Sequence, residues 1–138
     1  MIYWKHAFFT KLFGHIVVSI SIPVCAQTQN TVAYEGLVDG IKLLTEAKFS
    51  KNDLKRFDIF SESPPISLST AASSVNLALR RNMQFRGFVV ESVKCVRLFD
   101  SAYWVVTAVR RAKSSDPKNR ETVVFVISMG GKLFGPSM

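Results

Sequence analysis

Three patterns of hydrophobic and polar positions divide this chain, and the first is an apolar run near the N-terminus. The run extends from Leu12 to Val24 and is interrupted by glycine, histidine, two serines and a proline. Lys5 and Lys11 precede it, and the small residues of Cys25-Ala26 follow it. This order of basic, apolar and small residues is typical of a secretory signal peptide, so we predict cleavage after residue 26.

The same segment leaves two alternatives, an uncleaved membrane anchor and a lipid-modified Cys25. Its apolar stretch is shorter than the roughly 20 residues that span a bilayer. The residues Ile22-Pro23-Val24 depart from the pattern that lipid attachment usually requires. Cleavage leaves residues 27–138 as a single domain, exported to the periplasm or the cell exterior, in which we expect no transmembrane span.

The second pattern is a helical spacing of apolar residues, which predicts a first helix over Thr31–Ala47. Its apolar positions recur at intervals of three and four residues, at Tyr34, Leu37, Val38, Ile41 and Leu44. A short second helix is expected from Ser50, which is a suitable N-cap, with Asp53 in its first turn. The sequence therefore predicts helices at the beginning of the domain.

A third helix is expected after a break at Pro64-Pro65, since two prolines cannot continue a helix. Its predicted range is Thr70–Phe85, and Ser69 or Thr70 is the natural cap. Its apolar side is formed by Val75, Leu77, Ala78, Leu79, Met83 and Phe85.

The third pattern is a run of β-branched and aromatic residues, which predicts strands at about 88–99, 102–112 and 120–129. Asp100-Ser101 is a tight connection, and residues 113–119 form a longer loop. Gly130-Gly131 is a two-residue hairpin signal, so a short fourth strand is expected at 132–134. The predicted fold class is α+β, with N-terminal helices packed on a curved antiparallel meander of three to four strands.

Both faces of the predicted sheet are apolar, and short helices cover one of them. Four arrangements would bury the second face: a cone-shaped sheet that encloses a cavity, a second copy of the chain, another protein, or helices that wrap both faces. The candidate residues for a partner or a ligand on the sheet are Trp104, Val106, Phe125 and Ile127.

The order of elements resembles, at the level of the fold alone, the cone-shaped domains of the nuclear-transport-factor-2-like and cystatin-like classes. The resemblance covers residues 27–138 and rests on helices followed by a curved meander rather than on a motif. Such folds host enzymes, ligand pockets and assembly scaffolds alike, so the resemblance implies an architecture and no particular function.

Candidate chemistry is sparse because both histidines, His6 and His15, lie in the predicted signal peptide. Without them the domain has no serine–histidine–acid triad and no histidine-bound zinc. There is no CxxC pair, phosphate-binding glycine loop or dinucleotide fingerprint. We therefore predict no catalytic residues, no metal and no cofactor. A hydrolase that uses carboxylates is the enzymatic alternative, although no spacing selects a pair.

Basic residues form the remaining candidate site. The whole chain carries 18 lysines and arginines against 10 acidic residues, a formal net charge of +8. Pairing of the second and third predicted strands brings five of them to one hairpin tip, namely Arg110, Arg111, Lys113, Lys118 and Arg120. Such a tip suits phosphate or carboxylate groups, or is simply a solvated hairpin end. The stretch lacks interleaved aromatic residues, which argues against nucleic acid.

The sequence thus favours an exported, non-enzymatic binding or assembly protein of the periplasm or cell envelope. Its expected partners are a protein, a second copy of the chain, or an anionic component of the envelope. Cys95, the one cysteine outside the signal peptide, is expected to be buried in a strand or to form a disulfide across a dimer. A small-molecule or lipid carrier with an apolar cavity is the other alternative.

Overall fold

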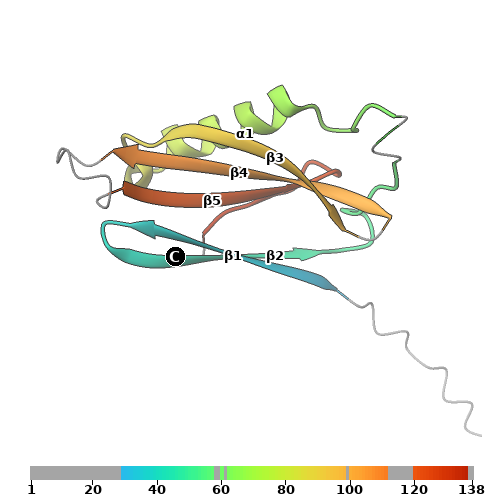
Figure 1. The fold of residues 1–138 in the computed structure, drawn as a ribbon, viewed down its shortest axis with the longest axis horizontal. Coiled ribbons are helices and arrows are strands. Elements are labelled where there is room, and N and C mark those ends of the chain that lie inside the picture. The colour runs from blue at the N-terminus through green and yellow to red at the C-terminus, as the bar shows by residue number, and fades with distance from the viewer. Residues whose placement is uncertain (1–28, 58–59, 61, 99, 112–119, 137–138) are drawn as a thin grey trace, which may run out of the picture.

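The computed structural model describes residues 29–57, 60, 62–98, 100–111 and 120–136. The described chain forms one α-helix and six antiparallel strands, so the predicted α+β class is confirmed (Figure 1). The elements are β1 (Asn30–Val38), β2 (Ile41–Phe49), α1 (Leu68–Arg81), the 3₁₀ turn η1 (Met83–Phe85), β3 (Val89–Leu98), β4 (Ser101–Arg111), β5 (Arg120–Ser128) and β6 (Leu133–Phe134). The predicted signal peptide lies outside the described residues.

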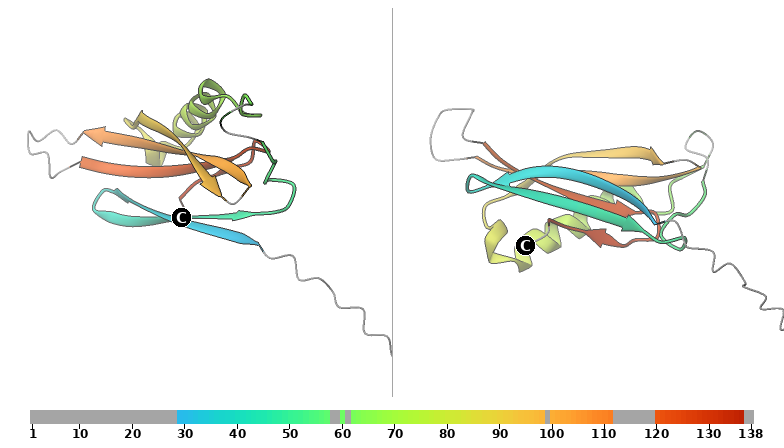
Figure 2. Two further views of the ribbon diagram at one scale, coloured as in Figure 1. Left: turned by 45° about the vertical axis from the view of Figure 1, so that its right-hand side comes forward. Right: turned by 90° about the horizontal axis from the view of Figure 1, so that it is seen from below.

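The strands follow the order β2-β1-β5-β4-β3, and β6 pairs with the second half of β5. In the described chain a single residue pair, Leu37 opposite Thr122, joins β1 to β5. The β1–β2 hairpin therefore leaves the plane of the sheet and lies beneath β3–β5, while α1 covers the opposite face (Figures 1 and 2). The result is three layers: helix, three-stranded sheet and hairpin.

The predicted helix over Thr31–Ala47 is wrong, because these residues form the β1–β2 hairpin. Asp39 and Gly40 make its turn with positive φ angles of 49° and 74°, and Asp-Gly is a strong signal for such a two-residue turn. The apparent helical stripe combined inward-facing Tyr34 and Val38 with exposed Leu37 and Leu44. Along each strand, inward-facing and outward-facing residues alternate, and the two-residue turn reverses which positions face inward. Inward and outward apolar residues taken together therefore recur at intervals of three and four.

The predicted second helix is also wrong in its described part, where Ser50–Asp53 forms an isolated turn. The Asp53 carboxylate accepts hydrogen bonds from the Ser50 amide at 2.9 Å and the Ser50 hydroxyl at 2.8 Å. The chain then runs beside β4, where the Ser101 hydroxyl donates to the Lys55 carbonyl at 2.7 Å. These contacts with β4 outweigh the local capping preference. Residues 58, 59 and 61 lie outside the described chain.

The third predicted helix is confirmed, with α1 beginning earlier, at Leu68. Ser67 caps it, and its hydroxyl accepts a hydrogen bond from the Thr70 amide at 3.1 Å. The helix ends at Arg81 and is followed by the separate turn η1, which Asn82 caps. The predicted strands are confirmed within one or two residues where they are described, as is the short last strand.

Two apolar clusters lie on opposite faces of β4 and β5. The first lies beneath α1, which contributes Ala71, Val75 and Leu79. The second is enclosed by the β1–β2 hairpin, which contributes Ala47 and Phe49. The second apolar face is thus covered by strands of the same chain, and none of the four coverings predicted from the sequence describes this arrangement.

Polar contacts and one glycine hold the hairpin against the sheet. The buried Thr45 hydroxyl donates to the Val124 carbonyl at 2.7 Å, and the Tyr34 and Tyr103 hydroxyls share a hydrogen bond of 2.6 Å. At Gly36 an added Cβ would lie 2.4 Å from the Thr122 carbonyl oxygen. Close approach of β1 to β5 therefore requires glycine at this position.

Candidate functional site

The four apolar site residues predicted on the sheet lie in the core beneath α1. Trp104 is 7% exposed, and Val106, Phe125 and Ile127 are 2% exposed or less. The Trp104 ring nitrogen donates to the Ile66 carbonyl at 2.8 Å. The structure thus places these side chains among packed core residues, not on an accessible face, because α1 and the segment before it cover them.

The structure describes three of the five residues of the predicted basic tip. Arg110 lies opposite Glu121 and Arg111 lies opposite Arg120, so the hairpin brings these arginines together as expected. Lys113 and Lys118 lie outside the described residues. Two carboxylates that the prediction did not include also lie here: Glu121 pairs with Arg110, and Glu91 of β3 pairs with Arg120. These ion pairs reduce the positive charge of the tip.

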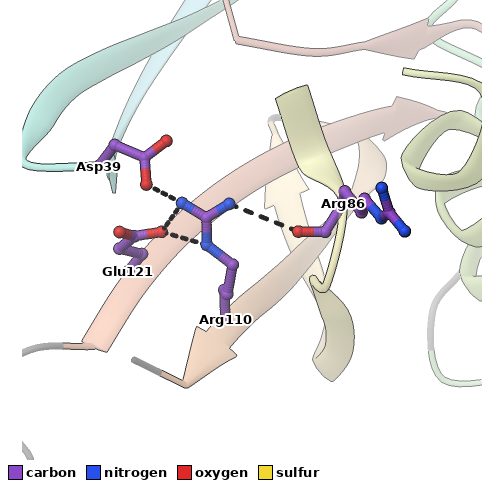
Figure 3. A network of polar contacts seen from close by, with 4 residues as sticks. All are labelled: Asp39, Arg86, Arg110 and Glu121. Atoms are coloured by element: carbon purple, nitrogen blue, oxygen red, sulfur yellow. Dashed lines mark hydrogen bonds and ion pairs between the residues drawn. The ribbon is translucent and has the colours of Figure 1, made fainter. Parts of the chain in front are cut away.

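Arg110 links segments that are distant in the sequence (Figure 3). Its Nε donates to the Glu121 carboxylate at 2.5 Å, and its guanidinium also pairs with Asp39 in the turn of the β1–β2 hairpin. A third, longer hydrogen bond of 3.4 Å reaches the Arg86 carbonyl. The guanidinium also lies 5.0 Å from the centre of the Phe88 ring. Arg110 therefore connects the hairpin turn, β5 and the loop before β3, and is committed to these internal contacts.

A groove beside this node combines exposed arginines with an apolar floor. It lies where α1 ends, η1 follows and β3 begins, and it encloses about 490 Å³. We call it the α1–β3 groove; its lining residues are Asn76, Leu79, Arg80, Asn82, Met83, Phe85, Arg86, Gly87, Phe88 and Val89. The buried rings of Phe85 and Phe88 meet edge to face, with their centres 6.0 Å apart. None of these lining residues is acidic.

The arginines of the α1–β3 groove differ from those elsewhere in the described chain. Arg80 and Arg86 are exposed, and no described carboxylate lies within ion-pair distance of either guanidinium. A second groove holds Arg56 and Arg97, but Glu62 and Asp100 line it as well. The α1–β3 groove therefore combines unpaired arginines with a lining that contains no acid, which the second groove does not.

Several of the described carboxylates are engaged in structural contacts. Asp100 pairs with Arg56 at 2.6 Å, and Glu35 pairs with Lys42 at 2.8 Å. Burial alone would raise the pKa of Asp53, but the two hydrogen bonds from Ser50 outweigh burial and hold it below its ordinary value. Among the described residues no group of histidine, cysteine, aspartate and glutamate side chains is arranged to hold a metal ion.

Sequence reasoning missed the α1–β3 groove because it extended the helix to Phe85. Asn82 instead caps η1, and its side chain accepts a hydrogen bond from the Gln84 amide at 3.0 Å. Met83, predicted on the apolar side of the helix, is consequently 85% exposed. The available signal was Asn82 itself, because asparagine favours caps and turns over helix interiors.

The structure has no helix, within the residues it describes, of sufficient length and apolar character to cross a membrane. Comparison of the chain with protein-family models, with curated proteins and with solved structures finds no match to any of the three.

Proposed function

We propose that this chain is a non-enzymatic binding protein whose α1–β3 groove holds an anionic partner with an apolar part. The observation that carries the proposal is the pair of exposed arginines, Arg80 and Arg86, above a floor of buried phenylalanines, with no acid in the lining. We further propose that the predicted signal peptide exports the protein, so that the partner belongs to the periplasm, the cell envelope or the exterior.

The chemistry of the groove supports this reading in two ways. A guanidinium offers paired donors that match the oxygens of a carboxylate or a phosphate. The side chains of Leu79, Phe85 and Phe88 provide apolar surface beside those donors. The groove's volume lies within the range of about 300–1,000 Å³ that small-ligand sites occupy. A single-chain anionic amphiphile has both properties that the lining selects.

Calorimetric titration with decyl phosphate, kept below its micelle-forming concentration, tests the proposal. We expect saturable binding that weakens at least tenfold in the double variant Arg80→Glu/Arg86→Glu, because both donors are lost and two charges repel the ligand. The matched control is Lys48→Glu/Lys94→Glu, which reverses two charges at exposed positions of β2 and β3, outside the groove.

The same titration with ethyl phosphate separates charge from apolar contact. Weaker binding of the short chain is expected, since it leaves the apolar floor uncovered. Equal affinity of the two double variants for decyl phosphate would overturn the proposal, as would the absence of binding to the unmodified protein.

A further inference from the structure

We infer that one end of the molecule docks on an anionic lipid surface. This end, which we call the bridged end, consists of residues 37–41 at the β1–β2 turn and residues 83–89 from η1 to the start of β3. The inference rests on the proposed function, because it names the lipid bilayer as the source of the anionic, partly apolar partner. It extends the site beyond the groove to a surface that two distant segments share.

Arg110 establishes that these two segments are neighbours. Its guanidinium contacts the Asp39 carboxylate on one side and the Arg86 carbonyl on the other (Figure 3). Figure 1 shows the hairpin turn at the same end of the molecule as the start of β3 and the end of β4. The segments lie more than forty residues apart in the chain, so the fold creates the bridged end.

Large apolar side chains are exposed on both segments of the bridged end. The hairpin contributes Leu37 at 47% exposure and Ile41 at 64%, and the other segment contributes Met83 at 85% and Val89 at 61%. Leu37 and Ile41 point to opposite faces of the hairpin, since Ile41 is paired with Val38, but both lie beside its turn. Single exposed apolar residues are common, whereas several at one end of a molecule indicate an interaction surface. Partial insertion of such side chains is how interfacial proteins enter the boundary between headgroups and acyl chains.

The charge of the bridged end complements an anionic surface. Arg86 lies within it, and Arg80 and Arg81 end α1 directly before it. The acids nearby are paired with arginines: Asp39 and Glu121 with Arg110, and Glu91 with Arg120. Three carboxylates and two guanidiniums leave one negative charge, which the three positive charges of Arg80, Arg81 and Arg86 exceed. Positive charge therefore remains available to lipid headgroups, as in the basic clusters that attract peripheral proteins to anionic bilayers.

The distribution of apolar residues favours a surface over a soluble ligand. A small molecule in the α1–β3 groove would cover Met83 and Val89, which line it, but would leave Leu37 and Ile41 exposed. A bilayer contacts both segments at once. It also supplies the phosphate oxygens and the apolar chains that the groove selects.

Methionine oxidation provides a local measurement of docking. Met83 is 85% exposed whereas Met129 is fully buried, so dilute peroxide should oxidise Met83 first, with Met129 as the internal control. The protein is isolated from cells that express the full chain and is mixed with vesicles of phosphatidylcholine, with or without phosphatidylglycerol. We expect the phosphatidylglycerol vesicles to slow Met83 oxidation several-fold, and vesicles of phosphatidylcholine alone to leave its rate unchanged.

Ile41→Asp tests the hairpin side of the bridged end, because Ile41 lies outside the groove lining. We expect this variant to lose at least tenfold in vesicle affinity and to lose the protection of Met83, while it still binds decyl phosphate. The matched control is Leu68→Asp at the other end of α1, where a 53% exposed leucine should be replaceable without effect.

The outcomes separate this inference from the proposed function. An unchanged rate of Met83 oxidation with phosphatidylglycerol vesicles would overturn the inference, even where decyl phosphate binds. Equal vesicle affinity of Ile41→Asp and Leu68→Asp would overturn it as well. A protected Met83 together with no decyl phosphate binding would overturn the proposed function and support the surface contact alone.

Discussion

At the scale of single residues, Arg110 has a different role from the one that its sequence position predicts. A basic residue at the end of a strand, among other basic residues, is typical of a ligand-binding or solvated tip. In the structure its side chain is 24% exposed and lies between two carboxylates and an aromatic ring. The acids responsible, Asp39 and Glu121, are 71 and 11 residues away. Sequence spacing alone could not bring Asp39 to this node.

Replacing Arg110 with glutamine should destabilise the fold by about 2 kcal/mol, because it leaves the partly buried Glu121 without its partner. The measurement is urea-induced unfolding. Arg56→Gln is the control. Arg56 pairs with Asp100 in a largely exposed ion pair, so its replacement should reduce the free energy of unfolding much less. Equal losses in the two variants would contradict the structural role assigned to Arg110.

The lowered pKa of Asp53 determines how this residue's contribution to stability depends on pH. Its pKa in the folded protein lies below its ordinary value because the hydrogen bonds from Ser50 outweigh the effect of burial. The unfolded chain, with a pKa of about 3.9, therefore binds the proton first on acidification. The stabilisation from Asp53 is present above about pH 4 and is lost as the pH falls through the folded-state pKa.

Asp53→Asn should reduce stability at neutral pH by about 1–2 kcal/mol and should flatten the loss of stability on acidification below about pH 4. Urea unfolding across the acidic range measures both effects. Glu46→Gln, at an exposed position of β2, is the matched control and should preserve the slope of the unmodified protein. A variant of Asp53 with an unchanged slope would show that other groups control the acid response.

At the scale of elements, the sequence predicted the second half of the domain well and the first half poorly. Strands β3, β4 and β5 were predictable because β-branched residues recur throughout them, with aromatic residues added in β4 and β5. The β1–β2 hairpin alternates less clearly, since its outer face carries Leu37 and Leu44 beside charged residues. Its decisive signal was the Asp39-Gly40 turn, which a helical reading of the spacing overlooks. The basic site predicted from the sequence lies at the tip of the β4–β5 hairpin; the groove was not predicted, because it arises where α1, η1 and β3 meet.

The crossing of β1 over β5 should be the most sensitive position of the hairpin. Gly36→Ala is expected to cost about 1–3 kcal/mol, because the new methyl group would meet the Thr122 carbonyl and the Val123 backbone. Gly40→Ala is the control: no atom lies within 4 Å of its added Cβ, and its cost comes from a positive φ of 74°. The rate of hydrogen exchange should rise along β1 and β2 in Gly36→Ala. A rise in Gly40→Ala but not in Gly36→Ala would show that the contact between β1 and β5 does not require glycine at position 36.

At the scale of the whole molecule, β4 and β5 belong to two cores at once. Val106 faces the cluster under α1, and Val126 faces the cluster under the hairpin; both are fully buried. Because the same two strands carry both clusters, loss of either cluster removes support from the other. The helix and the hairpin are therefore expected to unfold together.

Val106→Ala and Val126→Ala should each destabilise the whole domain by about 2 kcal/mol. Helical circular dichroism reports α1, and hydrogen exchange of the β1 and β2 amides reports the hairpin. In both variants the helical signal and the protection of these amides should be lost at one urea concentration, as a two-state transition requires. Loss of amide protection in β1 and β2 at a lower urea concentration than the helical change in Val126→Ala would show that the hairpin unfolds independently.

The attachment of the hairpin also determines when the chain can complete its fold. The ribosome makes β1 and β2 first, but their supporting strand, β5, is the last long strand to be made. The Thr45–Val124 hydrogen bond spans 79 residues. Until β5 emerges, the hairpin lacks the strand that β1 pairs with and half of the cluster that its inner face covers, and an isolated two-stranded hairpin is marginally stable at best. Folding is therefore delayed to the end of synthesis, and a nascent chain truncated before Arg120 exposes apolar surface that a chaperone would bind.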